Sequence, residues 1–213
     1  MDYHLDFNIN FRRNPYRGRL IILEGIDGSG KTLQVSRLAK ILGKTHPVFT
    51  AKNPTYGHIG QLIRKVLRSN VSLSPIALQY LFAADRQEQQ REIISHLKKG
   101  EVVLLDRYFW SAVAYGSLDQ RGEILLIAQS ILSFYNQQLM PDQTFFLKVP
   151  PAEAMKRIKN KKQKEIYEEE KKLRFVEKTY EWLAKEFPEE IAIVDGTNSA
   201  NEVTEEILQR LTV

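Results

Sequence analysis

Short runs of apolar residues alternate along the chain with longer stretches in which apolar residues recur every three or four positions. The runs are four to seven residues long, which is typical of strands buried on both faces. They are Leu20–Leu23, Pro47–Thr50, Glu101–Arg107, Gln143–Val149 and Ile191–Val194. Because helical stretches separate these runs, the pattern predicts an α/β fold: a doubly wound parallel sheet with helices on both faces, in one domain.

The helical stretches are marked by residues that favour helix ends. Ser74-Pro75 is typical of an N-cap followed by proline at the first helical position, and Gly100 is expected to end the helix that follows. Pro150-Pro151 is expected to begin another helix. The other apolar stripes predict helices over about residues 35–42, 59–67, 110–116, 123–138, 173–184 and 203–211.

A glycine-rich turn joins the first strand to its helix. Gly25 to Thr32 fits the pattern G-x-x-x-x-G-K-[ST] of a phosphate-binding P-loop. Glycines let backbone N–H groups turn toward phosphate oxygens, and the helix N-terminus adds a partial positive charge. Lys31 is expected to reach the terminal phosphates, while the Thr32 hydroxyl is a ligand for Mg²⁺. The predicted ATP-binding residues of the loop are Gly25, Asp27, Gly28, Ser29, Gly30, Lys31 and Thr32.

A carboxylate ends the central apolar run. Asp106 follows Leu105 directly, and a carboxylate in this place beside a P-loop holds Mg²⁺, directly or through water. Arg107 comes next and is expected at the carboxyl end of the strand, where ligands bind in open α/β sheets. Lys31, Asp106 and Arg107 are therefore the predicted catalytic residues, and Thr32 and Asp106 are the predicted ligands of Mg²⁺ with ATP.

The composition narrows the class of protein. A chain of 213 residues with 43% hydrophobic and 27% charged residues can form one globular domain with a sizeable core. It has no cysteine, which excludes disulfides and thiolate metal sites and is compatible with a reducing cytoplasm. No apolar run is long enough for a bilayer, so we expect a cytoplasmic protein without a membrane partner. The net charge of +5 is compatible with nucleic acid, but lysine and glutamate are interleaved and a phosphate-rich small substrate explains the charge equally well. We expect no nucleic-acid partner.

Three segments have more than one interpretation. Residues 1–18 show no clear period, and Arg12–Gly18 is typical of a loop, so we expect a solvated N-terminal extension before a domain over 19–213. Ala83–Arg86 interrupts an apolar stripe with charge, which on periodicity alone indicates a solvated helix face. Residues 156–172 are dense in lysine and glutamate, which is typical either of a solvated face or of a short lid over phosphates.

From about Arg19 to Val213 the chain resembles the thymidylate kinases. The elements Ala-Asp-Arg and Asp-Arg-Tyr, in this order after a P-loop containing Gly-Ile-Asp-Gly, are more specific than the P-loop alone. The resemblance implies a five-stranded parallel sheet, transfer of a phosphoryl group from ATP to dTMP, and a homodimer. The motifs that carry it are Glu24–Thr32, Lys52–Gly60, Phe82–Arg86, Asp106–Tyr115, Pro141-Asp142 and Asp195–Asn198.

The resemblance also implies roles for single residues. Asp27 would bind the deoxyribose 3′-hydroxyl, Arg107 would hold the acceptor phosphate, and Tyr115 would lie against the sugar and disfavour a 2′-hydroxyl. Phe82 would stack on thymine while Arg86 bonds a thymine carbonyl, which distinguishes thymine from cytosine because the cytosine amine is itself a donor. The other implied residues are Pro54 and Ser111 at the acceptor, and Arg157, Thr197 and Asn198 beside adenine.

The chain departs from the family pattern in the loop after the second strand, at Gly116, at Leu33, where a second hydroxyl residue is frequent, and in a short lid that lacks the usual arginine cluster. Lys52-Asn53-Pro54 stands where Arg-Glu-Pro is common, and lysine lacks the bidentate fork of arginine. Gly116 stands where bacterial members often carry glutamine. The P-loop holds no basic side chain between Asp27 and Gly30, so we expect the lid to supply a cation to the transferred group. The lid offers Arg157, which the resemblance places near adenine, and the candidate lysines Lys159, Lys161, Lys162 and Lys164.

Two alternatives to a dTMP kinase stay open on the sequence. One is a related kinase that acts on another nucleoside monophosphate or on a deoxynucleoside, which would differ in the pocket of Phe82, Arg86 and Ser111. The other is a P-loop protein that binds a nucleotide to regulate a partner and transfers nothing. Such a protein has no need of an arginine at an acceptor site, the place expected for Arg107.

Overall fold

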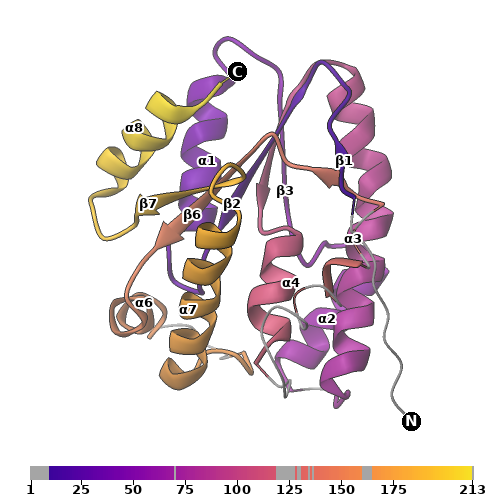
Figure 1. Ribbon diagram of the computed structural model, residues 1–213, viewed down its shortest axis with the longest axis vertical. Helices are drawn as coiled ribbons and strands as arrows, with labels where there is room; N and C mark the ends of the chain where they lie inside the picture. The colour runs from indigo at the N-terminus through magenta and orange to yellow at the C-terminus, as the bar shows by residue number, and fades with distance from the viewer. Residues whose placement is uncertain are drawn as a thin grey trace.

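The computed structural model describes residues 10–69, 71–118, 128, 131–133, 135, 137–159 and 165–212. Its centre is a five-stranded parallel sheet in the order β3-β4-β2-β6-β7, which confirms the predicted fold class (Figure 1). The strand after the P-loop helix therefore lies at one edge, and the last strand lies at the other. The bounds are β2 Arg19–Glu24, β3 Val48–Lys52, β4 Val102–Asp106, β6 Gln143–Lys148 and β7 Ile191–Asp195.

The alternation of side chains along β2 divides the core into two layers. Leu20 and Ile22 pack with helices on one face of the sheet, whereas Ile21 and Leu23 pack with helices on the other. The first face is covered by α2 His58–Leu67, α3 Pro75–Lys98, α4 Phe109–Gly116 and α7 Glu170–Glu186; the second is covered by α1 Lys31–Leu42 and α8 Ala200–Arg210 (Figure 1).

The helix ends follow the local chemistry of the sequence. Ser74 is the N-cap of α3, where its hydroxyl accepts a hydrogen bond from the Ala77 N–H, and Pro75 is the first helical residue. Gly100, with φ of +84°, turns the chain out of this helix toward β4, as predicted. No helix within the described ranges is long and apolar enough to cross a membrane.

The segment before β2 differs from the predicted loop. β1 Arg12–Arg13 pairs in parallel with β5 Leu139–Met140, so this part of the segment is a short strand. Phe11 packs against the larger core cluster and stacks on Phe109, with the ring centroids 5.5 Å apart. The prediction of a loop at Arg12–Arg13 was wrong because a strand of two residues is too short to leave a pattern. The division into an extension and a domain stays a prediction.

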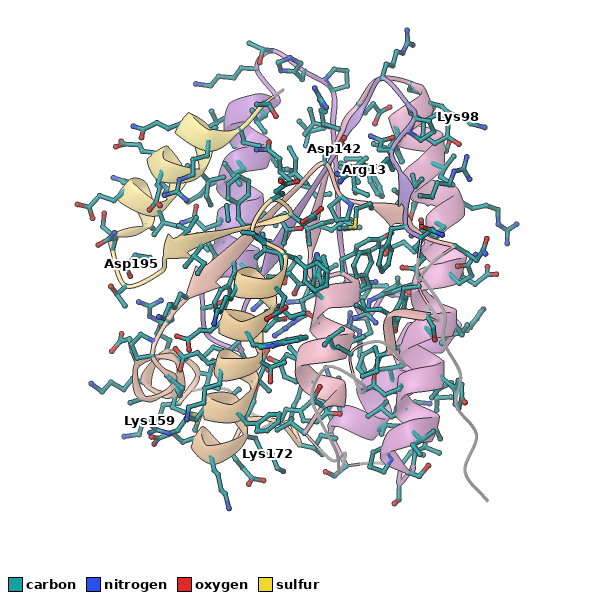
Figure 2. All side chains as sticks on the ribbon, viewed as in Figure 1. Arg13, Lys98, Asp142, Lys159, Lys172 and Asp195 are labelled. Atoms are coloured by element: carbon teal, nitrogen blue, oxygen red, sulfur yellow. The ribbon has the colours of Figure 1, made fainter. Side chains whose placement is uncertain are left out.

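Asp142 ties this segment to the sheet. Its carboxylate accepts hydrogen bonds from the Asn14 side chain and from the Leu20 N–H, each 2.7 Å long, and it is labelled near Arg13 in Figure 2. The Pro141-Asp142 motif is therefore a connection between the first residues described and the central strand. The chain of contacts gives the N-terminal segment a fixed place on the fold.

Two predicted segments fall largely outside the described residues. The helix expected over 123–138 is one of them, since only a few of its positions are described. The lid is the other: α6 Pro151–Ile158 leads into it and α7 leaves it, while residues 160–164 lie outside the described ranges. Figure 2 places Lys159 and Lys172, which lie on either side of it, at the same end of the molecule.

Candidate active site

The P-loop lies where the chain leaves β2, at the carboxyl edge of the sheet. Gly28 and Gly30 have φ of +85° and +95°, a region that only glycine adopts without strain. A Cβ at Gly28 would lie 2.5 Å from the carbonyl oxygen of Ala154, so the loop packs against α6 with no room for a side chain. These positions require glycine for backbone reasons. Of the loop N–H groups, that of Ser29 donates to the Ile26 carbonyl oxygen at 3.2 Å.

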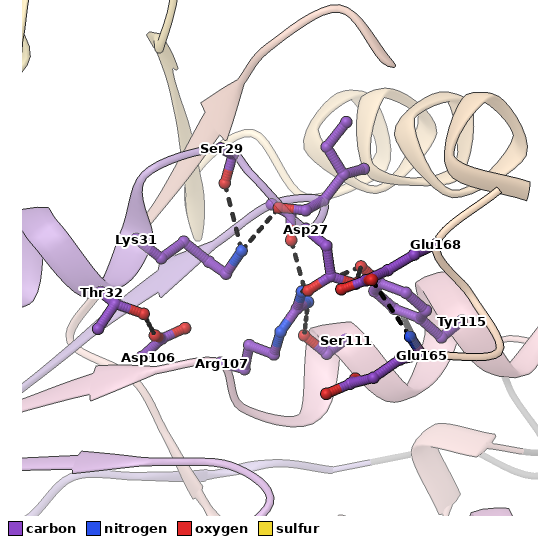
Figure 3. Close-up of polar contacts among 12 residues, drawn as sticks. Asp27, Ser29, Lys31, Thr32, Asp106, Arg107, Ser111, Tyr115, Glu165 and Glu168 are labelled. Carbon is purple, nitrogen blue, oxygen red and sulfur yellow. Dashed lines mark hydrogen bonds and ion pairs between the residues drawn. The ribbon is translucent and has the colours of Figure 1, made fainter. Parts of the chain in front are cut away.

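Lys31 is almost fully buried inside this loop. Its ammonium donates to the Ile26 carbonyl oxygen at 2.7 Å and to the Ser29 hydroxyl at 3.2 Å (Figure 3). Burial, and then the neighbouring Arg107 guanidinium, lower the pKa of Lys31 to about 7. Both of these hydrogen-bond acceptors are neutral, so a polyanion bound in the loop would give the ammonium an anionic partner.

Asp106 is the last residue of β4, and its carboxylate contacts a hydroxyl group and an ammonium group. Its Oδ2 accepts a short hydrogen bond from the Thr32 hydroxyl, and the Lys52 ammonium lies 3.1 Å away (Figure 3 shows the contact with Thr32). Its Oδ1 is buried and has no hydrogen-bond partner in the described part of the chain. Burial alone would raise the pKa of Asp106, but Lys31 and Lys52 outweigh it and hold that pKa below its usual value.

Arg107 connects the P-loop to α4. Its φ of +74° turns the side chain back from the end of β4. The guanidinium donates to the Gly25 carbonyl oxygen at 2.9 Å, to Asp27 Oδ1 at 2.7 Å, to the Tyr115 hydroxyl at 3.0 Å and to the Ser111 hydroxyl at 3.2 Å (Figure 3). Burial raises the pKa of Tyr115 well above its ordinary value, so its hydroxyl keeps its proton and donates to Asp27.

A cavity opens to solvent beside Arg107. It brings together most of the residues that sequence reasoning assigned to the acceptor. Asn53 is the residue of the loop after β3 that lines it, whereas the adjacent Pro54 directs its carbonyl oxygen to Arg64. The predicted acceptor residues that line the cavity are Asp27, Phe82, Arg86, Arg107, Ser111 and Tyr115.

Asp85 and Arg86 of α3 are buried, which corrects the solvated face that periodicity indicates for Ala83–Arg86. Asp85 and Arg86 are each 2% exposed. Asp85 accepts hydrogen bonds from the backbone and side chain of Thr55, while Arg86 donates to the Tyr135 hydroxyl at 3.2 Å. No described residue forms an ion pair with Arg86, so its charge is free to meet a ligand in the cavity that it lines.

A wider hollow of about 930 Å³ continues from the acceptor cavity along the P-loop. Asp27 and Arg107 line both spaces, so a group bound in one lies next to a group bound in the other. Five cationic side chains line the hollow: Lys31, Lys52, Arg64, Arg107 and Arg157. This concentration of positive charge is suited to a polyphosphate.

Of the predicted adenine residues, Arg157 lines the hollow. The exposed Arg157 of α6 donates to the Gly196 carbonyl oxygen at 3.1 Å, which places it beside the turn that follows β7. Within this turn the Thr197 N–H and hydroxyl both donate to Asp195, and the Asn198 N–H donates to the Asp195 carbonyl oxygen. The structure thus brings Arg157, Thr197 and Asn198 together.

Sequence reasoning missed a buried glutamate beneath the acceptor cavity. Glu24, at the end of β2, accepts hydrogen bonds from the backbone N–H groups of Tyr108 and Ser111 and from the hydroxyls of Ser111 and Tyr180. It is fully buried, and these bonds fix the start of α4. An acid directly before the P-loop glycine was the only signal in the sequence, and it gives no hint of partners that lie over 80 residues away.

Comparison with known proteins decides the family. The family model described as thymidylate kinase matches residues 23–207, which is most of the chain. The chain belongs to the thymidylate kinase family. It is 37% identical to a probable thymidylate kinase of Methanocaldococcus jannaschii over 189 residues, covering 88% of this chain and 93% of the relative. It is 34% identical to a thymidylate kinase of Carboxydothermus hydrogenoformans over 195 residues, covering 90% and 95%.

A solved structure agrees with these relatives. The thymidylate kinase of Candida albicans superposes with a TM-score of 0.78 at 29% identity, covering 91% of this chain and 90% of that chain. Membership of the thymidylate kinase family makes the chain an enzyme, a nucleoside monophosphate kinase dependent on ATP. It does not favour the alternative of a regulatory P-loop protein.

Proposed function

We infer that the chain transfers the γ-phosphoryl group of ATP to dTMP, giving dTDP and ADP for dTTP synthesis. The observation that carries this inference is the shared boundary of two spaces. The acceptor cavity holds Phe82 and Arg86, the hollow holds the P-loop, and Arg107 lines both. An aromatic ring and an arginine in a small cavity suit a pyrimidine base, and the second space suits a triphosphate.

On the donor side, the P-loop would bind the phosphates of ATP and Lys31 would neutralise part of their charge. Backbone N–H groups of Gly28 to Thr32 would surround the β-phosphate, and Lys31 would leave its neutral partners Ile26 and Ser29 for phosphate oxygens. Phosphoryl transfer asks little covalent chemistry of a protein, so alignment and neutralisation provide most of the acceleration. Arg157, Thr197 and Asn198 would flank the adenine.

The residues at Asp106 fit a Mg²⁺ ion that arrives with ATP. Mg²⁺ is usually held by one or two carboxylates together with substrate phosphates. Asp106 Oδ1 is a buried oxygen without a partner among the described residues, and the Thr32 hydroxyl lies against Oδ2. Asp106 and Thr32 would therefore hold the ion, which when bound neutralises charge on the transferred group.

On the acceptor side, Arg107 would hold the phosphate of dTMP. Its present partner Asp27 would then be available to the 3′-hydroxyl, with Tyr115 against the sugar. Phe82 would stack on thymine, and Arg86 would donate to a carbonyl of the base. We also assign Ser111 and the Pro54 loop to the walls of this site. These assignments rest on the shared cavity and on the family motifs.

We further propose that the lid between α6 and α7 supplies the remaining cation. Of its lysines, Lys159 is within the described residues, and Lys161, Lys162 and Lys164 are outside them. Replacement of all four by glutamine is expected to lower kcat at least about tenfold with little effect on dTMP binding, because the contact forms mainly in the transition state. The family resemblance also supports a homodimer, which light scattering would test.

A steady-state assay of ADP formation over a panel of acceptors tests the proposed function. The panel contains dTMP, dUMP, dCMP, dAMP, dGMP and thymidine, each with ATP and Mg²⁺. We expect the highest kcat/KM for dTMP. A higher value for another monophosphate would replace the proposed acceptor, and a higher value for thymidine would reassign the enzyme to nucleosides. Turnover of ATP that no acceptor stimulates would contradict a kinase of this type.

A further inference from the structure

Gln79 is a buried polar residue of α3 that the assignments above do not use. It is 9% exposed, and its side chain lines the acceptor cavity. Its Oε1 atom is buried and has no hydrogen-bond partner among the residues that the structure describes. A buried carboxamide oxygen without a donor is unfavourable, so a polar group of a ligand is the natural partner for it.

Gln79 lies on the same face of α3 as the two predicted base-binding residues. Gln79, Phe82 and Arg86 stand at positions i, i+3 and i+7 of one helix, so they share a face. All three line the acceptor cavity. Within this cavity Arg86 Nε is a second buried atom without a partner in the described chain. A buried acceptor and a buried donor without described partners thus belong to two residues that line one small cavity.

Gly116 on α4 makes room for the Gln79 carboxamide. A Cβ at Gly116 would lie 2.8 Å from Ile131 Cδ1, 3.0 Å from Gln79 Cδ and 3.1 Å from Gln79 Nε2, all closer than ordinary contacts. The end of the Gln79 side chain therefore rests on the bare backbone of α4. Any larger residue at position 116 would compete with Gln79 for this place. The packing of the two helices consequently fixes where the carboxamide lies.

The acceptor Gln79 Oε1 and the donor Arg86 Nε complement the hydrogen-bonding edge of a pyrimidine dione. Such a base presents an N3–H donor between two carbonyl acceptors. Cytosine presents an unprotonated N3 and an amine, so both of its groups would meet a like partner. A site built to bond an N–H rejects an analogue without it strongly, because the buried polar group of the site is then left unpaired.

We propose that Gln79 is a specificity-determining residue whose carboxamide oxygen accepts a hydrogen bond from N3–H of the acceptor base. The inference rests on the proposed function, since it places the base of a nucleoside monophosphate in this cavity. Arg86 then donates to the adjacent carbonyl, and Phe82 covers the ring. The pair selects diones over cytosine, and the 5-methyl group lies outside its reach.

Calorimetric titration of dTMP, dUMP and dCMP tests this role with Gln79→Met, which keeps the length of the side chain and removes its hydrogen bonds. We expect dTMP and dUMP to bind at least about tenfold more weakly, with dCMP and ATP changed by less than about twofold. Gln87→Met is the matched control, because Gln87 is an exposed glutamine on the same helix. It is expected to bind all four ligands as the original protein does.

A relocation variant separates recognition from a purely structural role. Gln79→Ala empties the place beside Gly116, and Gly116→Gln in the same chain refills it from the opposite helix. We expect the double variant to recover much of the preference for dTMP over dCMP that Gln79→Ala loses, and Gly116→Ala alone to weaken dTMP binding by displacing the carboxamide. Melting temperatures of all variants report their folding.

The outcomes distinguish this inference from the proposed function. If the original protein binds and uses dTMP best and Gln79→Met keeps the dTMP to dCMP ratio, the role of Gln79 is wrong and the function stands. The same holds if the variant loses stability alone. If the original protein prefers a purine or cytosine monophosphate, the proposed acceptor and the dione-reading role of Gln79 both fail. Should Gln79→Met not fold, Gly116→Ala decides the matter.

Discussion

Lys31 is a buried ammonium whose described hydrogen-bond acceptors are neutral. The Ile26 carbonyl and the Ser29 hydroxyl orient the ammonium, but neither offsets the free energy lost when it leaves water. Burial is therefore the largest cause of the lowered pKa of Lys31. The empty loop therefore holds a lysine that readily gives up its proton. A bound polyphosphate reverses this balance, because opposite charge at short range favours the charged form.

Nucleotide binding is expected to take up protons above neutral pH. With a pKa of about 7 in the free protein, Lys31 is largely neutral at pH 8.5, and bound phosphates raise that pKa. Binding of ADP at pH 8.5 then takes up close to one proton, whereas binding at pH 6 takes up none from this group. The affinity falls by up to about tenfold per pH unit above pH 7.

Calorimetry of ADP binding in buffers of different ionisation enthalpy measures this uptake directly. Lys31→Met is the control, and it is expected to bind ADP more weakly with no uptake from this position. Equal uptake by the variant and the original protein would show that another group titrates.

Lys52 contacts both residues that we propose as ligands of the metal ion. Its ammonium lies 3.1 Å from both Asp106 Oδ2 and the Thr32 hydroxyl, because Lys52 and Asp106 are register partners on β3 and β4. Lys52→Met is expected to tighten Mn²⁺ binding to the ADP complex at least about threefold, since a competing charge is removed. Electron paramagnetic resonance of free Mn²⁺ provides the measurement.

Two further variants are controls for the effect of Lys52→Met on Mn²⁺ binding. Asp106→Asn is expected to weaken Mn²⁺ binding, and Lys65→Met, a change at an exposed lysine of α2, is expected to leave it unchanged. Unchanged or weaker binding in Lys52→Met would mean that the lysine and the metal occupy different places. Unchanged binding in Asp106→Asn would move the metal site itself.

The elements of the fold were predictable where their signals are local. β2 and β4 are continuous apolar runs, and α3 carries its own start and stop residues, so each can be recognised from neighbouring positions. The P-loop is equally local. The buried charges of α3 were not predictable, because Asp85 finds its partner in the loop after β3 and Arg86 in Tyr135, both distant in sequence. A helix with polar residues on its buried face shows no clean stripe.

The candidate site divides in the same way. Lys31 and Thr32 were predicted from the P-loop pattern, and Asp106 and Arg107 from their place at and just after the end of a strand. Gln79 carries no signal of its own, since a lone glutamine in a helix is ordinarily a surface residue. It becomes notable only when the fold sets it against Gly116 and leaves its oxygen unpaired.

Glu24 joins three elements, since β2 carries it and its bonds hold α4 and α7. Glu24→Gln would present an amide N–H₂ to groups that are themselves donors. We expect a loss of about 2–3 kcal/mol in the free energy of unfolding, measured by urea denaturation. We also expect a larger rise in KM for dTMP than for ATP, because the Ser111 hydroxyl that donates to Glu24 also accepts a hydrogen bond from Arg107.

Tyr180→Phe provides the comparison for this change. It removes the hydroxyl that donates to Glu24 and contacts the Ser111 hydroxyl, and it leaves the Glu24 carboxylate bonded to the Ser111 N–H and hydroxyl of α4, so the expected loss is about 1 kcal/mol. Equal losses in the two variants would indicate that the α7 contact, rather than the support of α4, dominates the role of Glu24.

At the scale of the whole molecule, the residues before β2 are part of the packed structure. Phe11 stacks on Phe109 at the start of α4, and β1 pairs with β5. Phe11→Ala is expected to cost about 1–3 kcal/mol of stability, less than for a fully buried phenylalanine. Arg12→Ala, at an exposed neighbouring position, is expected to change stability little; thermal unfolding compares them, and equal melting temperatures would mean that the aromatic contact contributes nothing.

The unpaired atoms of the acceptor cavity bear on how long the polypeptide survives. Asn53 Oδ1, Gln79 Oε1 and Arg86 Nε are buried with no partners in the described chain, so the empty fold carries their desolvation cost. A ligand that pairs them binds the folded chain alone and stabilises it, by about 2.7 kcal/mol at a hundred times its Kd. Degradation in cells often follows the population of opened molecules. We therefore expect the abundance of this enzyme to rise and fall with the pool of the monophosphate that it consumes.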